Sequence, residues 1–151
     1  GSGHIVGALA VVNALGDVLD GEGRIIAGTR GPDGAFLDSA RLAREGGTEP
    51  PLPGTNTTLC VVATDAPLDR SALEALARAG STGQARRLSP AHTPFDGDVT
   101  FAVSTTDETR PAGPELILAL GTLAADAVAE AIERAVRASG AGAVEDRPAG
   151  E

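Results

Sequence analysis

The chain has 151 residues and a formal net charge of −9 at pH 7, and 42% of its residues are hydrophobic. This length fits one ordinary domain with a buried core. Its 12 basic residues are all arginines, scattered along the chain instead of clustered, which excludes a surface that follows the phosphates of a nucleic acid.

A membrane protein is not expected from this sequence. No apolar run approaches the roughly 18 residues that a membrane span requires, and the first residues lack the basic flank of a signal peptide. We therefore expect a cytoplasmic protein without membrane contact. The single cysteine, Cys60, excludes an internal disulfide bond.

The first predicted element is a strand over residues 5–15, a nearly continuous run of apolar and small residues. Such a run is typical of a strand that is buried on both faces. Asn13 lies near its end. The residues alone favour a turn-forming role for this asparagine, and the other interpretation is an amide donor directed into a site.

Short elements are predicted after this strand. Turns are expected at residues 20–23 and 31–34, with a short strand at 24–27 between them. A marginal helix over residues 36–44 is expected to end at Gly46. The proline- and glycine-rich loop that follows, about residues 45–56, is long for a compact domain, and such loops are usually functional or disordered.

The central predicted strand covers residues 57–64, a β-branched apolar run that Asp65, Ala66 and Pro67 close. Cys60 lies inside this run and is interpreted as a buried hydrophobic residue, because a thiol in apolar surroundings is unreactive.

Helices flank a further strand in the second half of the chain. Asp69 is expected to cap a helix that the glycines at 80 and 83 interrupt or end. A second buried strand is predicted at residues 99–105. A long helix should begin at Pro114 and end before Gly140, and residues 141–151 have the composition of a disordered tail.

Three segments resemble a known family, and one of them, residues 6–13, matches a strand in the middle of the family's longer chains. Residues 56–68 (NTTLCVVATDAPL) and 92–98 (HTPFDGD) are similar to the P1 family of N-terminal-nucleophile aminopeptidases, peptidase family S58, which includes the DmpA-like D-aminopeptidases and the β-peptidyl aminopeptidases. In this family the precursor cuts itself before a serine or threonine, which becomes the catalytic N-terminus. The resemblance therefore implies autocleavage between Asn56 and Thr57.

The resemblance also implies a fold and a domain organisation. The expected architecture is α/β, a four-layer αββα sandwich of which this chain is a part, the C-terminal half of a longer precursor. Residues 1–56 would end the α-subunit portion and include the processing loop, and residues 57–140 would form the β-subunit portion.

The catalytic residues implied by the family are Thr57, Asn13, Asp98 and Asp96. Thr57 would be the nucleophile, with its own α-amine, of pKa about 7.7–8.0, as the base. Asn13 would donate to the oxyanion. Asp98 would orient the α-ammonium of the substrate or of Thr57, whereas Asp96 stands where many members have serine, so its role stays open. No cofactor and no metal are implied.

These residues also have simpler interpretations. Asp96-Gly97-Asp98 before a strand is a common turn, and its carboxylates could equally bind a cation weakly. His92, between two prolines, is interpreted as structural and is left out of the catalytic set. The sequon formed by residues 56–58 is a short pattern with many chance matches.

The function that we expect is hydrolysis of N-terminal aminoacyl amides, esters or short peptides through an acyl-enzyme on Thr57. The expected partners are these small substrates and further copies of the chain, as a homo-oligomer of αβ pairs. Two alternatives stay open. One is an acyl transferase similar to ornithine acetyltransferase, and the other is a non-catalytic fragment or a structural α/β module.

Overall fold

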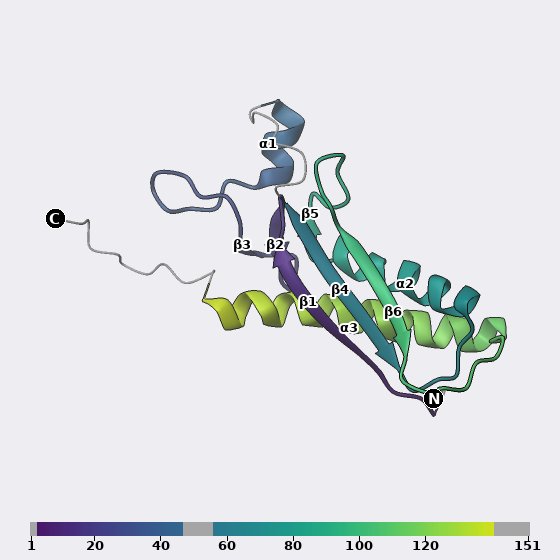
Figure 1. Ribbon diagram of the computed structural model, residues 1–151. Coiled ribbons are helices and arrows are strands. Elements are labelled where there is room, and N and C mark those ends of the chain that lie inside the picture. The colour runs from purple at the N-terminus through teal and green to yellow at the C-terminus, as the bar shows by residue number, and fades with distance from the viewer. Residues whose placement is uncertain (1–2, 47–55, 141–151) are drawn as a thin grey trace.

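The computed structural model of the protein describes residues 3–46 and 56–140 (Figure 1). Two expectations fall largely or wholly outside these residues. They are the tail at 141–151 and the processing loop, of which residues 47–55 are not described.

A three-stranded sheet forms the centre of the fold. Its strands are β1 (Val6–Asn13), β4 (Thr57–Thr64) and β6 (Val99–Ser104), in the order β1-β4-β6, with β1 antiparallel and β6 parallel to β4. The long helices α2 (Arg70–Ala85) and α3 (Pro114–Ser139) both lie on one face of this sheet (Figure 1). The α/β class predicted from the sequence is therefore confirmed.

A smaller sheet lies beside the end of β1. It consists of β2 (Asp17–Leu19), β3 (Ile25–Ala27) and β5 (Leu88–Ser89), in the order β3-β2-β5. The short helix α1 (Ser39–Glu45) follows β3 and buries none of its residues. The sequence predicted β3 and a short helix, but it gave no signal for β2 or β5, which have only three and two residues.

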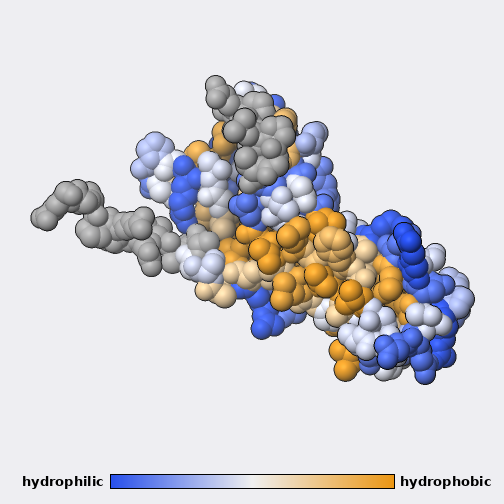
Figure 2. All heavy atoms as spheres, viewed as in Figure 1, coloured by the Kyte–Doolittle hydropathy of each residue, from blue (hydrophilic) through white to orange (hydrophobic). Residues whose placement is uncertain are grey.

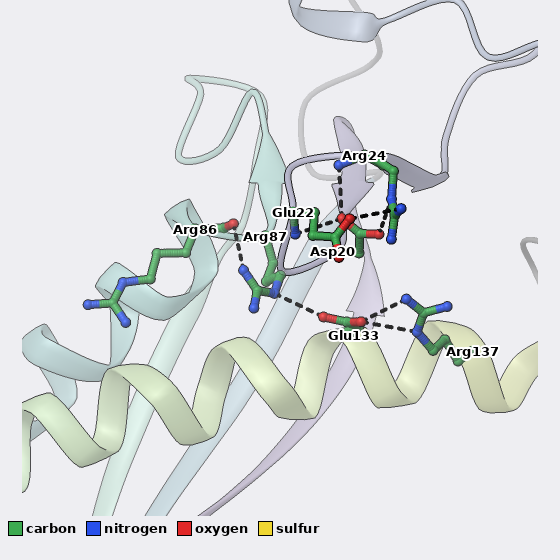
Figure 3. Close-up of polar contacts among 7 residues, drawn as sticks. All are labelled: Asp20, Glu22, Arg24, Arg86, Arg87, Glu133 and Arg137. Carbon is green, nitrogen blue, oxygen red and sulfur yellow. Dashed lines mark hydrogen bonds and ion pairs between the residues drawn. The ribbon is translucent and has the colours of Figure 1, made fainter.

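The β2–β3 hairpin closes around one buried carboxylate (Figure 3). Asp20 Oδ1 accepts hydrogen bonds from the backbone amides of Glu22 and Arg24, at 2.9 Å each, and Oδ2 accepts from Arg24 Nε at 2.8 Å. The amide of Arg24, followed by its guanidinium, lowers the pKa of Asp20 from 3.8 to about 2. The turn predicted at residues 20–23 is thus held closed by the hydrogen bonds of the Asp20 carboxylate.

An ion-pair network joins the region of β5 to α3. Arg87 Nε lies 3.4 Å from Glu133 Oε2, and Arg137 Nη2 lies 2.8 Å from Glu133 Oε1 (Figure 3). The Glu133 side chain is only 22% exposed, so water screens its pair with Arg87 less than it screens an ordinary surface pair. This network connects the smaller sheet to the helix layer.

Several local predictions are confirmed. Strand β4 has the predicted bounds, and Asp69 Oδ1 accepts from the amide of Ala72 at 2.8 Å as the N-cap of α2. Pro114 opens α3, and Gly140 ends it in a left-handed conformation. Cys60 is completely buried, and burial raises the pKa of its thiol.

The predicted break of α2 at its glycines is wrong, because the helix runs through both. Their lack of a side chain serves packing instead. A Cβ at Gly83 would lie 2.4 Å from the carbonyl oxygen of Ala125 in α3, and one at Gly80 would lie 3.0 Å from Val62 Cγ2 in β4. The glycines therefore let α2 approach both α3 and the sheet.

The prediction that residues 5–15 are buried on both faces is also wrong for this chain. Alternate residues of β1 face solvent, and the same is true of one side of β4 and β6. Large apolar side chains stand on this open face, and Figure 2 shows them as a continuous patch. They include Leu9 (62% exposed), Val11, Leu59, Val61, Phe101 (55% exposed) and Val103.

No helix in the described part of the chain combines the length and the apolar composition needed to cross a bilayer.

Candidate active site

Thr57 and Asn13 lie opposite each other on two adjacent strands. They are directly paired in the antiparallel β1–β4 ladder, at the point where β1 ends and β4 begins. The alternation of buried and less buried residues in β4 directs Thr58 toward the helices and Thr57 toward the open face. Asn13 lies on that same face, two residues after the exposed Val11.

The hydroxyl of Thr57 lies next to the carbonyl group that precedes it. Thr57 Oγ1 donates a hydrogen bond to the carbonyl oxygen of Asn56 at 2.7 Å. The backbone amide of Gly97 donates to the same oxygen at 3.0 Å. The carbonyl of the Asn56–Thr57 peptide bond thus receives two donors, and both polarise it.

Gly97 has a close approach that no other residue type would permit without movement. A Cβ at this position would lie 2.5 Å from Thr57 Oγ1. A parallel β-bridge between Asn56 and Asp96 holds the chain around Gly97 against the start of β4. The absence of a side chain at residue 97 therefore leaves room for the Thr57 hydroxyl in its observed position.

Asp98 is a buried carboxylate directly behind this position. Its side chain is 3% exposed, and Oδ1 accepts a hydrogen bond from the backbone amide of Thr58 at 2.7 Å. The other oxygen, Oδ2, lies 3.9 Å from Nδ1 of His92. Asp98 thus fixes the backbone of the residue that follows Thr57.

Asp96 and His92 belong to the turn that leads to Asp98. Asp96 Oδ2 accepts from the amide of Thr93 at 2.8 Å, which closes the turn. His92 adopts a left-handed φ of 53°, and its Nε2 lies 3.4 Å from the carbonyl oxygen of Ser81. The contact of the Asp96 carboxylate is therefore within its own turn.

The fold brings Thr57, Asn13 and Asp98 to one end of the central sheet. Thr57 begins β4, Asn13 ends β1, and Asp98 directly precedes β6. The sequence offered little reason to single out Gly97 or Gln84, a completely buried glutamine whose amide nitrogen lies 3.3 Å from the carbonyl oxygen of the residue after Thr57. A glycine between two aspartates was the only signal for the first. Gln84 gave none, because a glutamine late in a predicted helix usually faces solvent.

A groove of about 460 Å³ runs beside Asn13. It lies along the outer edge of β1, and its lining includes Val12, Asn13, Gly16, Ala135 and Ser139. The groove has room for a small organic group beside Asn13, whereas Thr57 is not part of its lining. In the described residues, no cluster of three or more histidine, cysteine or acidic side chains is arranged to hold a metal ion.

The arrangement is suited to acyl transfer. The Thr57 hydroxyl lies against the Asn56 carbonyl, which the Gly97 amide polarises. Asn13 is paired with Thr57 in the ladder, and the buried carboxylate of Asp98 bonds the next residue of β4. Acyl-transfer sites need these components, namely a nucleophile, oxyanion donors and an orienting charge.

Comparison with known proteins gives consistent matches. The model of peptidase family S58 matches residues 1–147. An uncharacterised aminopeptidase of Mycobacterium leprae is 38% identical over 151 residues, which cover 91% of this chain and 42% of that protein. One of Mycobacterium tuberculosis H37Rv is also 38% identical, over 87% of this chain and 43% of that protein.

A solved structure shares the fold. The β-aminopeptidase of a Burkholderia species superposes with a TM-score of 0.50 at 22% sequence identity, and the match covers 87% of this chain and 41% of that one. The chain thus spans about two fifths of the length of the curated relatives it matches, which are 42% and 43% covered.

Proposed function

Since the chain belongs to peptidase family S58, we propose that the protein is a self-processing aminopeptidase, a hydrolase with an N-terminal threonine nucleophile. The family expected from the segments at 56–68 and 92–98 is confirmed by the family match. The proposed substrates are N-terminal aminoacyl amides, esters and short peptides. The proposed setting is the cytoplasm, and the proposed assembly is an oligomer of αβ pairs.

One observation carries this proposal. The Thr57 hydroxyl and the Gly97 amide converge on the carbonyl oxygen of Asn56, at 2.7 and 3.0 Å. The hydroxyl thus already lies beside the carbonyl group whose carbon it would attack, and this closeness of the two reacting groups favours an intramolecular reaction. An ordinary strand start does not need a close-packed glycine beside its first hydroxyl.

Self-processing would proceed by an acyl shift. The Thr57 Oγ attacks the carbonyl carbon of Asn56, and the negative charge that develops on the oxygen is stabilised by the Gly97 amide. The bond from that carbon to the Thr57 nitrogen then breaks, and the nitrogen gains a proton. Water hydrolyses the resulting ester, so Asn56 ends with a carboxylate and Thr57 with a free amine and a free hydroxyl.

The new amine provides what the precursor lacks. With a pKa of about 7.7–8.0 it can accept the Thr57 hydroxyl proton at neutral pH. Thr57 then attacks the carbonyl of a substrate, and water resolves the acyl-enzyme. Asn13 is proposed to donate to the oxyanion, and its pairing with Thr57 across the ladder supports this role.

A role in orienting an ammonium group is suited to the carboxylate of Asp98. The buried carboxylate already bonds the amide of Thr58, so it lies one residue from the proposed ammonium group of Thr57. We propose that Asp98 orients that ammonium or the one of the substrate. No separate catalytic role is proposed for Asp96, whose carboxylate bonds the Thr93 amide.

We also propose that the complete fold is a four-layer αββα sandwich. The open face of the β1-β4-β6 sheet supports this, because exposed apolar patches of this kind mark contact surfaces. A second sheet, with its own helices, would cover that face. Thr57 and Asn13 lie on the same side, so the reaction would take place at the edge of the covered interface.

Mass spectrometry of the purified protein tests the proposal. We expect two fragments whose boundary is the Asn56–Thr57 bond, and release of amines from aminoacyl amides without any added acceptor. Thr57→Ala should leave a single uncut polypeptide without turnover, whereas Thr57→Ser should still cut. An uncut wild-type protein, or turnover that survives Thr57→Ala, would refute the proposed enzyme.

A further inference from the structure

One buried polar side chain behind Thr57 has no part in the chemistry described so far. Gln84, on the last turn of α2, is completely buried. Its amide nitrogen points between the starts of β4 and β6, where Nε2 lies 3.3 Å from the carbonyl oxygens of both Thr58 and Val99. Carbonyl oxygens only accept, so the nitrogen is the donor to both strands.

The contact to Thr58 lies where the β4–β6 ladder begins. The parallel register between β4 and β6 begins at Leu59 and Val99, so Thr58 lies one residue before it. The amide of Thr58 donates to the Asp98 carboxylate at 2.7 Å, and its carbonyl oxygen accepts from Gln84. Both backbone groups of the residue after Thr57 are therefore bonded by side chains.

The same side chain crosses to β6. Because Gln84 also bonds the Val99 carbonyl oxygen, it connects the residue after Thr57 to the residue after Asp98. The sulfur of Cys60 also lies 3.3 Å from Gln84 Nε2. An amide nitrogen has two hydrogens, and the two carbonyl oxygens can use both.

Stability alone gives a poor explanation of this arrangement. Among the described residues, three oxygens of the same region are buried without a hydrogen-bond partner: Gln84 Oε1, Thr58 Oγ1 and Thr100 Oγ1. Buried polar atoms without partners are costly, and a core of apolar side chains avoids that cost. Conflicts of this kind in natural proteins are expected at functional sites.

We propose that Gln84 is a positioning residue for the self-processing reaction. By bonding the Thr58 and Val99 carbonyl oxygens together, it sets the start of β4 against the Gly97–Asp98 segment. This setting keeps the Thr57 hydroxyl and the Gly97 amide directed at the Asn56 carbonyl. The inference rests on the proposed function, because it assigns Gln84 to that same site.

The test compares Gln84→Met with a matched control. Methionine has a similar length and no donor, so the two strand starts lose their shared partner. Leu76→Val shortens another fully buried side chain of α2, about 12 Å away along the helix. Each protein is made by cell-free synthesis, its cutting is followed over time by mass spectrometry, and its melting temperature is measured as the Thr57→Ala double variant.

We expect Gln84→Met to slow cutting by about 10- to 100-fold, as small misplacements of reacting groups do. Leu76→Val should cut at the wild-type rate even where its melting temperature falls further. In the cut enzyme, Gln84→Met should lower kcat and leave KM nearly unchanged, because the groove beside Asn13 is not altered.

A second variant tests the donor itself. In Gln84→Glu, an ionised carboxylate cannot donate to the carbonyl oxygens, but a protonated one can donate to one of them. The ratio of its cutting rate to that of the wild type should therefore rise as the pH falls. An unchanged ratio, or cutting by Gln84→Met at the rate of the control, overturns the inference. A wild-type protein that never cuts overturns the proposed function instead.

Discussion

Asn13 and Thr57 are direct partners in the β1–β4 ladder, although 43 residues lie between them in the chain. Directly opposed residues on one face of an antiparallel pair have neighbouring side chains. The side chains of Asn13 and Thr57 are therefore neighbours at the end of the sheet, and the ladder fixes the positions of the two residues relative to each other. The consequences of this geometry can be measured.

Asn13→Ala removes the proposed oxyanion donor. We expect kcat of the cut enzyme to fall by about 10²- to 10³-fold, the usual cost of losing such a donor, with a small change in KM. Val61→Ala is the control, since it shortens a side chain on the same open face that does not line the groove beside Asn13. Equal kinetics of both variants would contradict a donor role for Asn13.

Gly97→Ala introduces a Cβ that would lie 2.5 Å from Thr57 Oγ1. The hydroxyl must then rotate away from the Asn56 carbonyl, so we expect self-cutting to slow by about 10²-fold. Gly7→Ala is the control, because a Cβ there meets nothing within 4 Å. Time courses by mass spectrometry compare the two, and rapid cutting of Gly97→Ala would argue against the observed orientation of Thr57.

Two substitutions of Asp98 separate its hydrogen bond from its charge. Asparagine can still accept from the Thr58 amide, whereas alanine cannot. We expect Asp98→Asn to cut itself faster than Asp98→Ala, and both to hydrolyse aminoacyl amides poorly because no charge orients the ammonium group. If Asp98→Asn hydrolyses substrates as the wild type does, the proposed charge interaction is absent.

The hydrogen bonds of the Asp20 carboxylate in the β2–β3 hairpin predict that the stability of the fold depends on pH. The pKa of Asp20 is lowered from 3.8 to about 2 in the folded protein. Its stabilising contribution is therefore complete above pH 3.8 and is lost as the pH falls toward 2. We expect Asp20→Asn to melt at a lower temperature than the wild type at pH 7, with the difference disappearing near pH 2.

Glu22→Gln is the matched control for that measurement. Glu22 also bonds Arg24, but its side chain is 72% exposed, and exposed pairs contribute little to stability. Its melting temperature should follow the wild type over the whole pH range. A difference between wild type and Asp20→Asn that persists unchanged at pH 2 would show that ionisation of Asp20 is not the cause.

Gly83→Ala should destabilise the protein even though alanine favours helices by about 1 kcal/mol over glycine. The new Cβ would lie 2.4 Å from the Ala125 carbonyl oxygen, a backbone atom of the neighbouring helix. We expect a net loss of about 1–3 kcal/mol in denaturant unfolding. Gly80→Ala should cost less, since its nearest neighbour is a side-chain methyl at 3.0 Å. A stabilised Gly83→Ala would mean that α2 and α3 separate easily.

The sequence by itself determined the features that depend on a few neighbouring residues. The bounds of β4, the N-cap at Asp69 and the start of α3 at Pro114 follow from β-branched runs, capping side chains and the fixed φ of proline. The resemblance of residues 56–68 and 92–98 to a known family was enough to predict the family, which the family match confirmed.

Tertiary structure decided which residues meet. The passage of α2 through Gly83 depends on the close approach of α3, and the bond from Gln84 to Thr58 spans 26 residues. The open face of the sheet depends on which layers are present to cover it. Local propensity cannot encode such relations, because they arise only when strands and helices distant in the chain pack against one another.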